Sequence, residues 1–268
     1  MFSLLFLVLA LGLLWPHSVQ AAKKNTTKYT IYVNRKTNLI NVVDEKTKKT
    51  VRAMYCSTGR NYRTIRGTYY TKAKYRWRCL KGNVYGQYAT RINGPYLFHS
   101  VPYYKKNVKT VETVEYNKLG SQASLGCVRL TVVDAKWIYD NCRVGTKVVI
   151  NDKKQLEKPL YLPIKISTKS KSGWDPTDPD KRNPYYPKIT LKSNKTVITK
   201  GSSFEPLSWV TATSSVSTKE ELRKTLTVKG KVNTQKTGKY TLTYSVKDPR
   251  TELITTKKIT FTVVAPKK

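Results

Sequence analysis

Acidic residues are scarce in this chain. Of its 268 residues, 16 are Asp or Glu and 51 are Lys or Arg, which gives a formal net charge of +35. A field of this strength concentrates polyanions near the surface, and nucleic acid, acidic lipid and anionic cell-wall polymer all fit it. Hydrophobic residues make up 39% of the chain and charged residues 25%, so the composition excludes a disordered protein and indicates a globular one.

Long apolar runs are absent except at the start of the chain. The run Phe2–Trp15 is followed by the polar residues His17 and Ser18 and by the small-residue end "VQAA". It is too short for a membrane span, so residues 1–22 are expected to be a secretory signal peptide. Since no Lys or Arg precedes the apolar run, an uncleaved anchor stays open. We expect a secreted protein with no stable membrane span after cleavage.

The chain also has few histidines, and it lacks paired-cysteine motifs. The chain has two histidines, and signal cleavage would remove His17 and leave His99 as the single imidazole. No C-x-x-C occurs, so a zinc knuckle has no support, and we expect neither a metal nor a cofactor. The four cysteines all precede residue 143, at positions Cys56, Cys79, Cys127 and Cys142.

The pattern of apolar residues predicts a mostly β protein with two domains. Over residues 28–151, alternating segments predict strands, and Thr131 with Asp134 is typical of the start of one main helix that runs to about Cys142. Residues 189–268 are rich in Thr, Val and Ile with period-2 alternation, which predicts an all-β sandwich.

Residues 152–188 join these two regions and are rich in proline and charge. This composition is typical of a semi-extended linker. A structured packing arm is the alternative, because Trp174, Tyr185 and Tyr186 could dock on a neighbouring domain.

Two short segments carry the candidate chemistry. Cys127 lies in "SLGC" and His99 in "LFHS", 28 residues earlier, far enough to leave one strand and return. A thiol needs a base or a positive neighbour to become a good nucleophile, and His99 and Arg129 are candidates. Gly126 would let the backbone turn tightly beside a substrate carbonyl. Each residue also has a structural interpretation: a disulfide or core cysteine, a structural histidine, a turn glycine and a surface cation.

The segments "YLFHS" and "ASLGCVRL" together resemble the L,D-transpeptidase catalytic domain (YkuD-like) family, as do "STGR" and "YGQYATRI". The resemblance covers about residues 29–151 and implies a β-rich catalytic domain. It also implies a role for each motif residue: nucleophile (Cys127), base (His99), carbonyl that orients the base (Ser100), oxyanion amides (Gly126 and Cys127) and substrate contacts (Arg129 and Ser124). Leu125 stands where many family members have a second histidine. The segment "GKYTLTYSV" resembles bacterial immunoglobulin-like wall domains.

The resemblance implies a secreted cysteine L,D-transpeptidase of a bacterial, Gram-positive cell wall. Such an enzyme takes a peptidoglycan stem peptide, releases D-Ala and passes the acyl group to an amine. Water as acceptor would make it an L,D-carboxypeptidase. A non-catalytic wall-binding protein, held to anionic wall polymers by its charge, is the alternative. Nucleic acid is not expected as a partner, because the chain is exported and has no nucleic-acid motif.

The remaining cysteines limit the disulfides. A working nucleophile at Cys127 must stay reduced, which leaves three cysteines and at most one bridge. We expect a Cys56–Cys142 bridge, with Cys79 as the remaining thiol. Three free thiols are the alternative.

Overall fold

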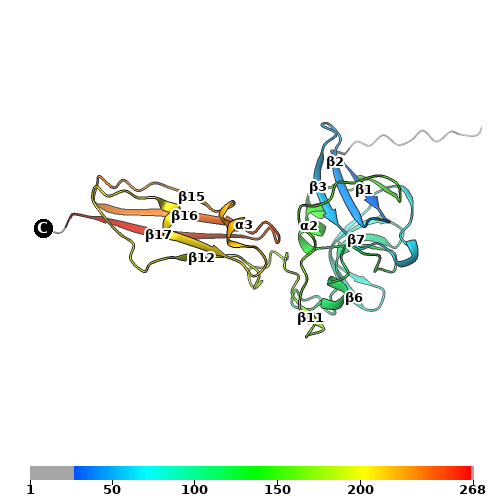
Figure 1. The fold of residues 1–268 in the computed structure, drawn as a ribbon. Helices are drawn as coiled ribbons and strands as arrows, with labels where there is room; N and C mark the ends of the chain where they lie inside the picture. Colours follow the sequence, from blue (N-terminus) through cyan, green and yellow to red (C-terminus); the bar gives the residue numbers. More distant parts are fainter. Residues whose placement is uncertain (1–26, 267–268) are drawn as a thin grey trace, which may run out of the picture.

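The computed structural model describes residues 27–266, so the expected signal peptide at residues 1–22 lies outside the described residues. The chain forms two bodies, and each has its own hydrophobic core. Figure 1 shows the N-terminal domain, with strands β1–β10, beside a more elongated C-terminal domain. The prediction of a mostly β protein is confirmed. Within residues 27–266, no helix is both long enough and apolar enough to span a bilayer.

The first sheet of the N-terminal domain has the strand order β3-β2-β1-β10-β4. Its strands alternate Val and Ile with polar residues, and the apolar side chains enter the core. Strand β1 pairs in parallel with β10, which brings the two ends of the domain together. The strands are β1 (Tyr29–Asn34), β2 (Leu39–Asp44), β3 (Thr50–Tyr55), β4 (Gly67–Tyr70) and β10 (Lys147–Asn151).

The second sheet, β5-β6-β7-β9, carries the candidate chemistry. Strand β7 pairs in parallel with β9, and His99 lies opposite Arg129 in that register. Strand β5 was not predicted from the sequence. The members are β5 (Lys74–Leu80), β6 (Val84–Asn93), β7 (Tyr96–Ser100) and β9 (Val128–Leu130), and the shorter elements are η1 (Arg60–Tyr62), β8 (Val111–Glu112), α1 (Thr113–Tyr116) and β11 (Ser172–Gly173).

The main helix is α2 (Val132–Asn141), and its predicted start is confirmed. The Thr131 hydroxyl accepts a hydrogen bond from the Asp134 amide at 3.3 Å, which satisfies one of the free donors of the first turn. One face of the helix is fully buried, through Val132, Ala135 and Ile138. This face belongs to the same core as the two sheets.

The segment that follows β10 is a packing arm over its second half. Asp175 accepts a hydrogen bond from the Val132 amide at 2.9 Å, at the start of α2. Asp178 accepts another from the Gln87 side chain at 2.7 Å, and Tyr185 packs against the core. The linker interpretation is therefore wrong for this half, because its buried polar side chains find partners in the N-terminal domain.

The C-terminal domain is the predicted β-sandwich. A two-stranded sheet, β12-β14, packs with a four-stranded sheet, β13-β17-β16-β15, around a core that includes Phe261 and Tyr244. A short helix, α3 (Lys219–Arg223), begins at a capping box and was not predicted from the all-β pattern. The strands are β12 (Lys188–Leu191), β13 (Val197–Thr199), β14 (Val210–Thr213), β15 (Thr227–Lys229), β16 (Gly238–Lys247) and β17 (Ile254–Val264), with the turn η2 (Pro206–Trp209).

One arginine connects the two domains. The Arg52 guanidinium lies 2.6 Å from a carboxylate oxygen of Asp134 in the N-terminal domain and 2.6 Å from one of Glu252 in the C-terminal domain. The pairs are largely shielded from solvent, and the guanidinium is shared between two acids.

The expected Cys56–Cys142 bridge is wrong, because all four cysteines within residues 27–266 are free thiols. Cys56 lies near the start of α2, where the charge of Asp134 acts on it, whereas Cys142 follows the last residue of the helix. The eight residues from Asp134 to Cys142 span about 12 Å of helix. A bridge requires Cα atoms roughly 4.4–6.8 Å apart. Both thiols instead belong to the hydrophobic core.

Candidate active site

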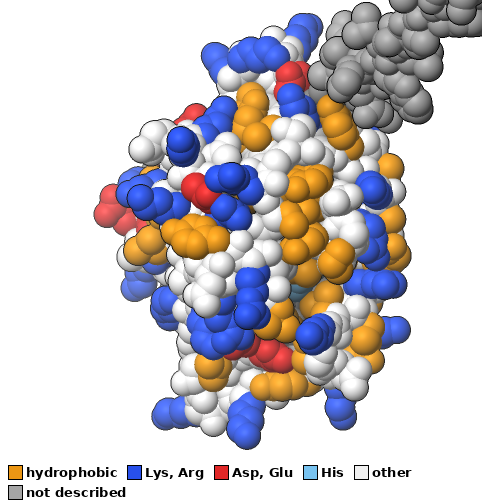
Figure 2. Space-filling model, turned by 90° about the vertical axis from the view of Figure 1, so that its right-hand side faces the viewer, with side chains coloured by type: hydrophobic (Ala, Val, Ile, Leu, Met, Phe, Trp, Pro, Cys, Tyr) orange, Lys and Arg blue, Asp and Glu red, His pale blue; other side chains and the backbone are white. Residues whose placement is uncertain are grey.

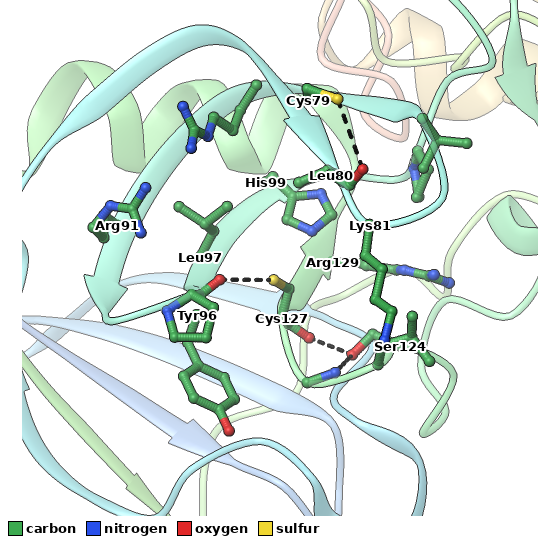
Figure 3. A pocket seen from close by; sticks show the side chains of 16 residues that line it. Cys79, Leu80, Lys81, Arg91, Tyr96, Leu97, His99, Ser124, Cys127 and Arg129 are labelled. Carbon is green, nitrogen blue, oxygen red and sulfur yellow. Dashed lines mark hydrogen bonds between the residues drawn. The ribbon is translucent and has the colours of Figure 1, made fainter.

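A cavity of about 390 Å³ opens on the second sheet of the N-terminal domain. Figure 3 shows that the β5–β6 hairpin forms one side, while β7 and the turn before β9 form the floor. The candidate nucleophile and base both line it. The lining residues are Arg78, Cys79, Leu80, Lys81, Val84, Arg91, Pro95, Tyr96, Leu97, His99, Pro102, Ser124, Leu125, Gly126, Cys127 and Arg129.

Cys127 projects into this cavity from the turn before β9. Its thiol donates a hydrogen bond to the Pro95 carbonyl, with 3.6 Å between sulfur and oxygen (Figure 3). Burial raises the pKa of the thiol above its ordinary value, and the Leu97 backbone amide and the charges of Arg129 and Arg91 act in the opposite direction. The resting group is therefore a thiol that needs a base in order to react.

His99 lies on β7 next to this thiol, with 2% of its surface exposed (Figure 3). Its Nδ1 is 2.5 Å from the Ser100 carbonyl oxygen, as the sequence resemblance implied. Because a carbonyl only accepts, Nδ1 carries the proton and Nε2 keeps its lone pair. Burial, followed by the charge of Arg129, lowers the pKa of His99 to about 4. The imidazole is therefore neutral at pH 7.

Gly86 is a site residue that sequence reasoning missed. A Cβ atom on this residue would lie 2.8 Å from Nδ1 of His99 and 2.9 Å from its Cβ. The missing side chain therefore makes room for the imidazole. The signal was a glycine inside the strand segment "YGQYATRI", since an interior strand glycine often marks the close approach of another group.

The turn that carries Cys127 is held together by Ser124. The Ser124 hydroxyl donates to the Cys127 carbonyl at 2.5 Å and accepts from the Gly126 amide at 3.0 Å. Ser124 is 1% exposed and lines the cavity, and both its hydroxyl and the Gly126 amide form hydrogen bonds within the turn. The substrate contact expected of Ser124 and the oxyanion role expected of the Gly126 and Cys127 amides stay predictions.

Gly126 is required at its position for a different reason. Its φ of +144° lies in the region that favours glycine, and a Cβ atom there would lie 2.9 Å from Cε1 of Tyr96. Its carbonyl accepts a hydrogen bond from the Thr64 hydroxyl at 2.7 Å. Backbone conformation and steric fit therefore set the direction in which Cys127 points.

Arg129 lines the cavity but is not a free cation. Its guanidinium pairs with the carboxylate of Glu115, a residue of α1. The two side chains are 12% and 20% exposed, so the pair is poorly screened by solvent. The residue nonetheless lines the cavity, and its charge acts on both His99 and Cys127.

Leu125 is half exposed at the mouth of the cavity and carries no hydrogen-bonding side chain. Among the residues that the structure describes, no group of three or more His, Cys, Asp and Glu side chains is placed to hold a metal ion.

Two family models match the chain. Residues 28–150 match the L,D-transpeptidase catalytic domain (YkuD), and residues 189–263 match the bacterial surface protein Ig-like domain. Over 125 residues the chain is 38% identical to "Putative L,D-transpeptidase YciB" of Bacillus subtilis (strain 168). That match covers 42% of this chain and 63% of the relative, so the chain spans less than two thirds of the relative's length.

Solved structures also resemble part of the chain. A fused Zn-dependent amidase/peptidase/peptidoglycan-binding domain-containing protein from Clostridium acetobutylicum ATCC 824 is 30% identical, with 46% of this chain and 52% of that chain covered and a TM-score of 0.37. An L,D-transpeptidase from Mycobacterium smegmatis is 20% identical, with 46% and 58% covered and a TM-score of 0.39. Because both TM-scores are below 0.5, the assignment rests on the family models and the curated relative. Residues 28–150 belong to the L,D-transpeptidase catalytic domain family and residues 189–263 to the bacterial surface Ig-like family.

Proposed function

We propose that this chain is a secreted L,D-transpeptidase that acts through Cys127 on peptidoglycan stem peptides. The observation that carries the proposal is the contact between Nδ1 of His99 and the Ser100 carbonyl oxygen. The Nδ1 proton is held by the Ser100 carbonyl, so the free Nε2 lone pair is left beside a thiol in the same cavity. This arrangement supports covalent acyl transfer.

In the first half-reaction, Cys127 attacks the carbonyl carbon of the amide that joins the L-centre of a diamino acid to a terminal D-Ala. Nε2 of His99 takes the thiol proton as the carbon–sulfur bond forms. The negative oxygen that develops accepts a hydrogen bond from the Cys127 amide. His99 then returns the proton to the leaving nitrogen, the carbon–nitrogen bond breaks, and a thioester remains.

In the second half-reaction, an amine of an acceptor stem peptide or protein attacks the thioester. His99 accepts a proton from that amine and passes it to the departing sulfur. A new amide forms and the Cys127 thiol is regenerated. If water attacks instead, the product is a shortened stem peptide, and the same site acts as an L,D-carboxypeptidase.

We propose that the positive surface keeps the enzyme at an anionic cell wall. Lys and Arg outnumber Asp and Glu by 51 to 16, and Figure 2 shows them distributed over one face of the N-terminal domain with few acidic side chains between them. Teichoic-acid-like polymers would be held electrostatically and released by salt. The Ig-like domain, which has its own core, would extend from the catalytic domain toward a wall partner.

The test is covalent trapping of the donor. The purified protein is incubated with a tetrapeptide stem, and released D-Ala and intact protein mass are measured together. Wild type should release D-Ala and gain the mass of the tripeptide acyl group, and Cys127→Ala should do neither. Cys79→Ala removes the other thiol that lines the cavity and is the matched control. An adduct that persists in Cys127→Ala, or that maps to Cys79, would refute the assignment.

A further inference from the structure

The active-site cavity is lined by four cations, Arg78, Lys81, Arg91 and Arg129, and by no Asp or Glu. Glu115 compensates the charge of Arg129. Within residues 27–266, no acidic side chain forms an ion pair with the other three. The cavity therefore presents uncompensated positive charge beside Cys127.

Two of these cations are held in place by a single aromatic ring. The guanidinium carbon of Arg78 lies 4.9 Å from the centre of the Tyr75 ring, and that of Arg91 lies 5.5 Å from the same centre. Arg91 also donates to the Tyr75 hydroxyl at 3.3 Å and to the Gly94 carbonyl. Stacking on a ring fixes a guanidinium while leaving its N–H edge free to donate.

Two positive charges placed around one ring indicate a binding site for an anion. Two guanidiniums that share a ring repel each other, and a cation–π contact at a partly exposed site is only a weak attraction. A carboxylate near both would relieve the repulsion and accept paired N–H donors from either arginine.

Both arginines stand next to the reacting groups. Arg78 lies opposite Gly86, the residue against which the His99 imidazole packs. Arg91 lies opposite Leu97, whose amide contacts the Cys127 thiol, and Figure 3 shows Arg91 on the same side of the cavity as Leu97. An anion held by these guanidiniums would therefore lie close to the scissile bond.

We infer that Arg78 and Arg91, positioned by Tyr75, form a carboxylate-binding subsite for the terminal carboxylate of the donor peptide. This inference rests on the proposed function for the identity of the donor. Tyr75 acts as a positioning residue, because it contacts the arginines and not the reacting atoms. A donor whose diamino acid also carries a side-chain carboxylate offers a second group of the same chemistry, so the test uses such a donor and separates the two sources.

The test measures binding without turnover. Cys127→Ala protein is titrated by calorimetry with a tetrapeptide stem, with the same peptide as its C-terminal amide, and with the peptide amidated at the diamino-acid side-chain carboxylate. The C-terminal amide should bind about 10- to 100-fold more weakly than the acid, the loss expected for charge-assisted hydrogen bonds. The side-chain amide should bind like the unmodified acid.

Variants then assign the effect to residues. In the Cys127→Ala background, Arg78→Gln and Arg91→Gln should each weaken binding of the acid and leave binding of the C-terminal amide unchanged. Tyr75→Leu should weaken it in the same way, whereas Tyr75→Phe keeps the ring and should retain most of the affinity. Arg223→Gln removes an exposed charge from α3 of the C-terminal domain and is the matched control.

Two outcomes would overturn the subsite: arginine variants that keep the full preference for the acid over the C-terminal amide, or loss of affinity only on amidation of the diamino-acid side chain. Failure of the proposed function looks different, because wild-type protein would then bind the acid through these arginines without releasing D-Ala. If wild type releases D-Ala but the arginine variants bind the acid as tightly as the Cys127→Ala protein does, the subsite is refuted and the proposed function stands.

Discussion

The carbonyl oxygen of Ser100 lies 2.5 Å from Nδ1 of His99, the side chain of the preceding residue on the same strand. One backbone group therefore fixes both the ring orientation and the tautomer of the proposed base, without a carboxylate partner. The neutral imidazole and the neutral thiol of Cys127 are the resting pair, since burial raises the pKa of the thiol and lowers that of the imidazole to about 4.

Replacing His99 should remove the base and little of the fold. His99→Gln is expected to lower kcat for D-Ala release about 10²- to 10⁴-fold, the range for a general base. KM should change much less. The measurement is steady-state release from a tetrapeptide, with circular dichroism to compare folding. A variant within a few-fold of wild type would show that His99 is structural.

The pH profile should report the lowered pKa of His99. The imidazole must be neutral to accept a proton, so activity is expected to fall as pH drops through about 4 and not through the ordinary value of 6.5. At pH 5 roughly nine tenths of the enzyme should still carry a neutral base. The check is kcat/KM between pH 4 and 8 at constant ionic strength, with folding followed at each pH. An acid limb near 6.5 would contradict the prediction.

Gly86→Ala should damage catalysis through one methyl group. The added Cβ would lie 2.8 Å from Nδ1 of His99, so the ring or the β6 backbone must move. We expect kcat to fall at least about 10-fold, since small misplacements of catalytic groups are costly. Gly173→Ala is the control, because that residue lies outside the cavity and has no positive φ, and its added Cβ would meet only a methyl group of Thr113, at 3.2 Å. Equal activity of Gly86→Ala and wild type would show that the contact is easily relieved.

Ser124→Ala should loosen the turn that aims Cys127. The variant loses a donor to the Cys127 carbonyl and an acceptor for the Gly126 amide, both buried. Stability should fall by about 1–3 kcal/mol, and acylation should slow as well. Chemical denaturation and the rate of adduct formation measure the two effects. Ser124→Thr retains the hydroxyl and should recover part of both. A substrate-contact role would instead raise KM and leave stability unchanged.

The sequence predicted the fold where the local signal agreed with the final packing. Alternating Val and Ile residues placed β1, β2 and β10, and Thr131 placed the start of α2. Strand β5 was missed because "KYRWRCL" alternates cations with aromatic rings and contains no Val or Ile, although Trp77 packs against the core. Its arginines are accommodated by rings such as Tyr75 and Tyr88, which only the folded structure brings together.

The sequence motifs named the residues of the proposed chemistry. They did not reveal the contacts that hold those residues in place. Cys127, His99 and the Ser100 carbonyl follow from two short motifs and lie together in the structure. The roles of Ser124 and Gly86 depend on hydrogen bonds and on how closely other atoms approach them. Neither can be predicted from residue type alone. The disulfide prediction failed for a similar reason. Cys56 follows β3 and Cys142 follows α2, and the length of that helix separates them.

The buried carboxyl of Asp175 should make stability depend on pH. Burial raises its pKa to about 7, so the folded state binds a proton more tightly than the unfolded state. Its contribution is fully present below the ordinary pKa of 3.8 and is lost as pH rises through about 7. Wild type should therefore lose stability progressively between pH 4 and 7 relative to Asp175→Asn, with little further change above pH 7. Asp175→Ala should lose about 1–3 kcal/mol at either pH, because the amides of Val132 and Thr177 lose their acceptor. Urea denaturation at each pH measures these differences, and parallel curves for wild type and Asp175→Asn would refute the shift.

The packing arm has a consequence for where the enzyme ends. The match to the catalytic family stops at residue 150, yet the first two amides of α2 donate hydrogen bonds to the side chains of Asp175 and Thr177. We therefore expect the part of the chain that unfolds together with α2 to extend beyond residue 150, where the sequence similarity stops. A fragment that stops at residue 151 would expose the start of the helix whose preceding strand carries Arg129, whereas a fragment that continues to residue 187 would keep that helix end covered.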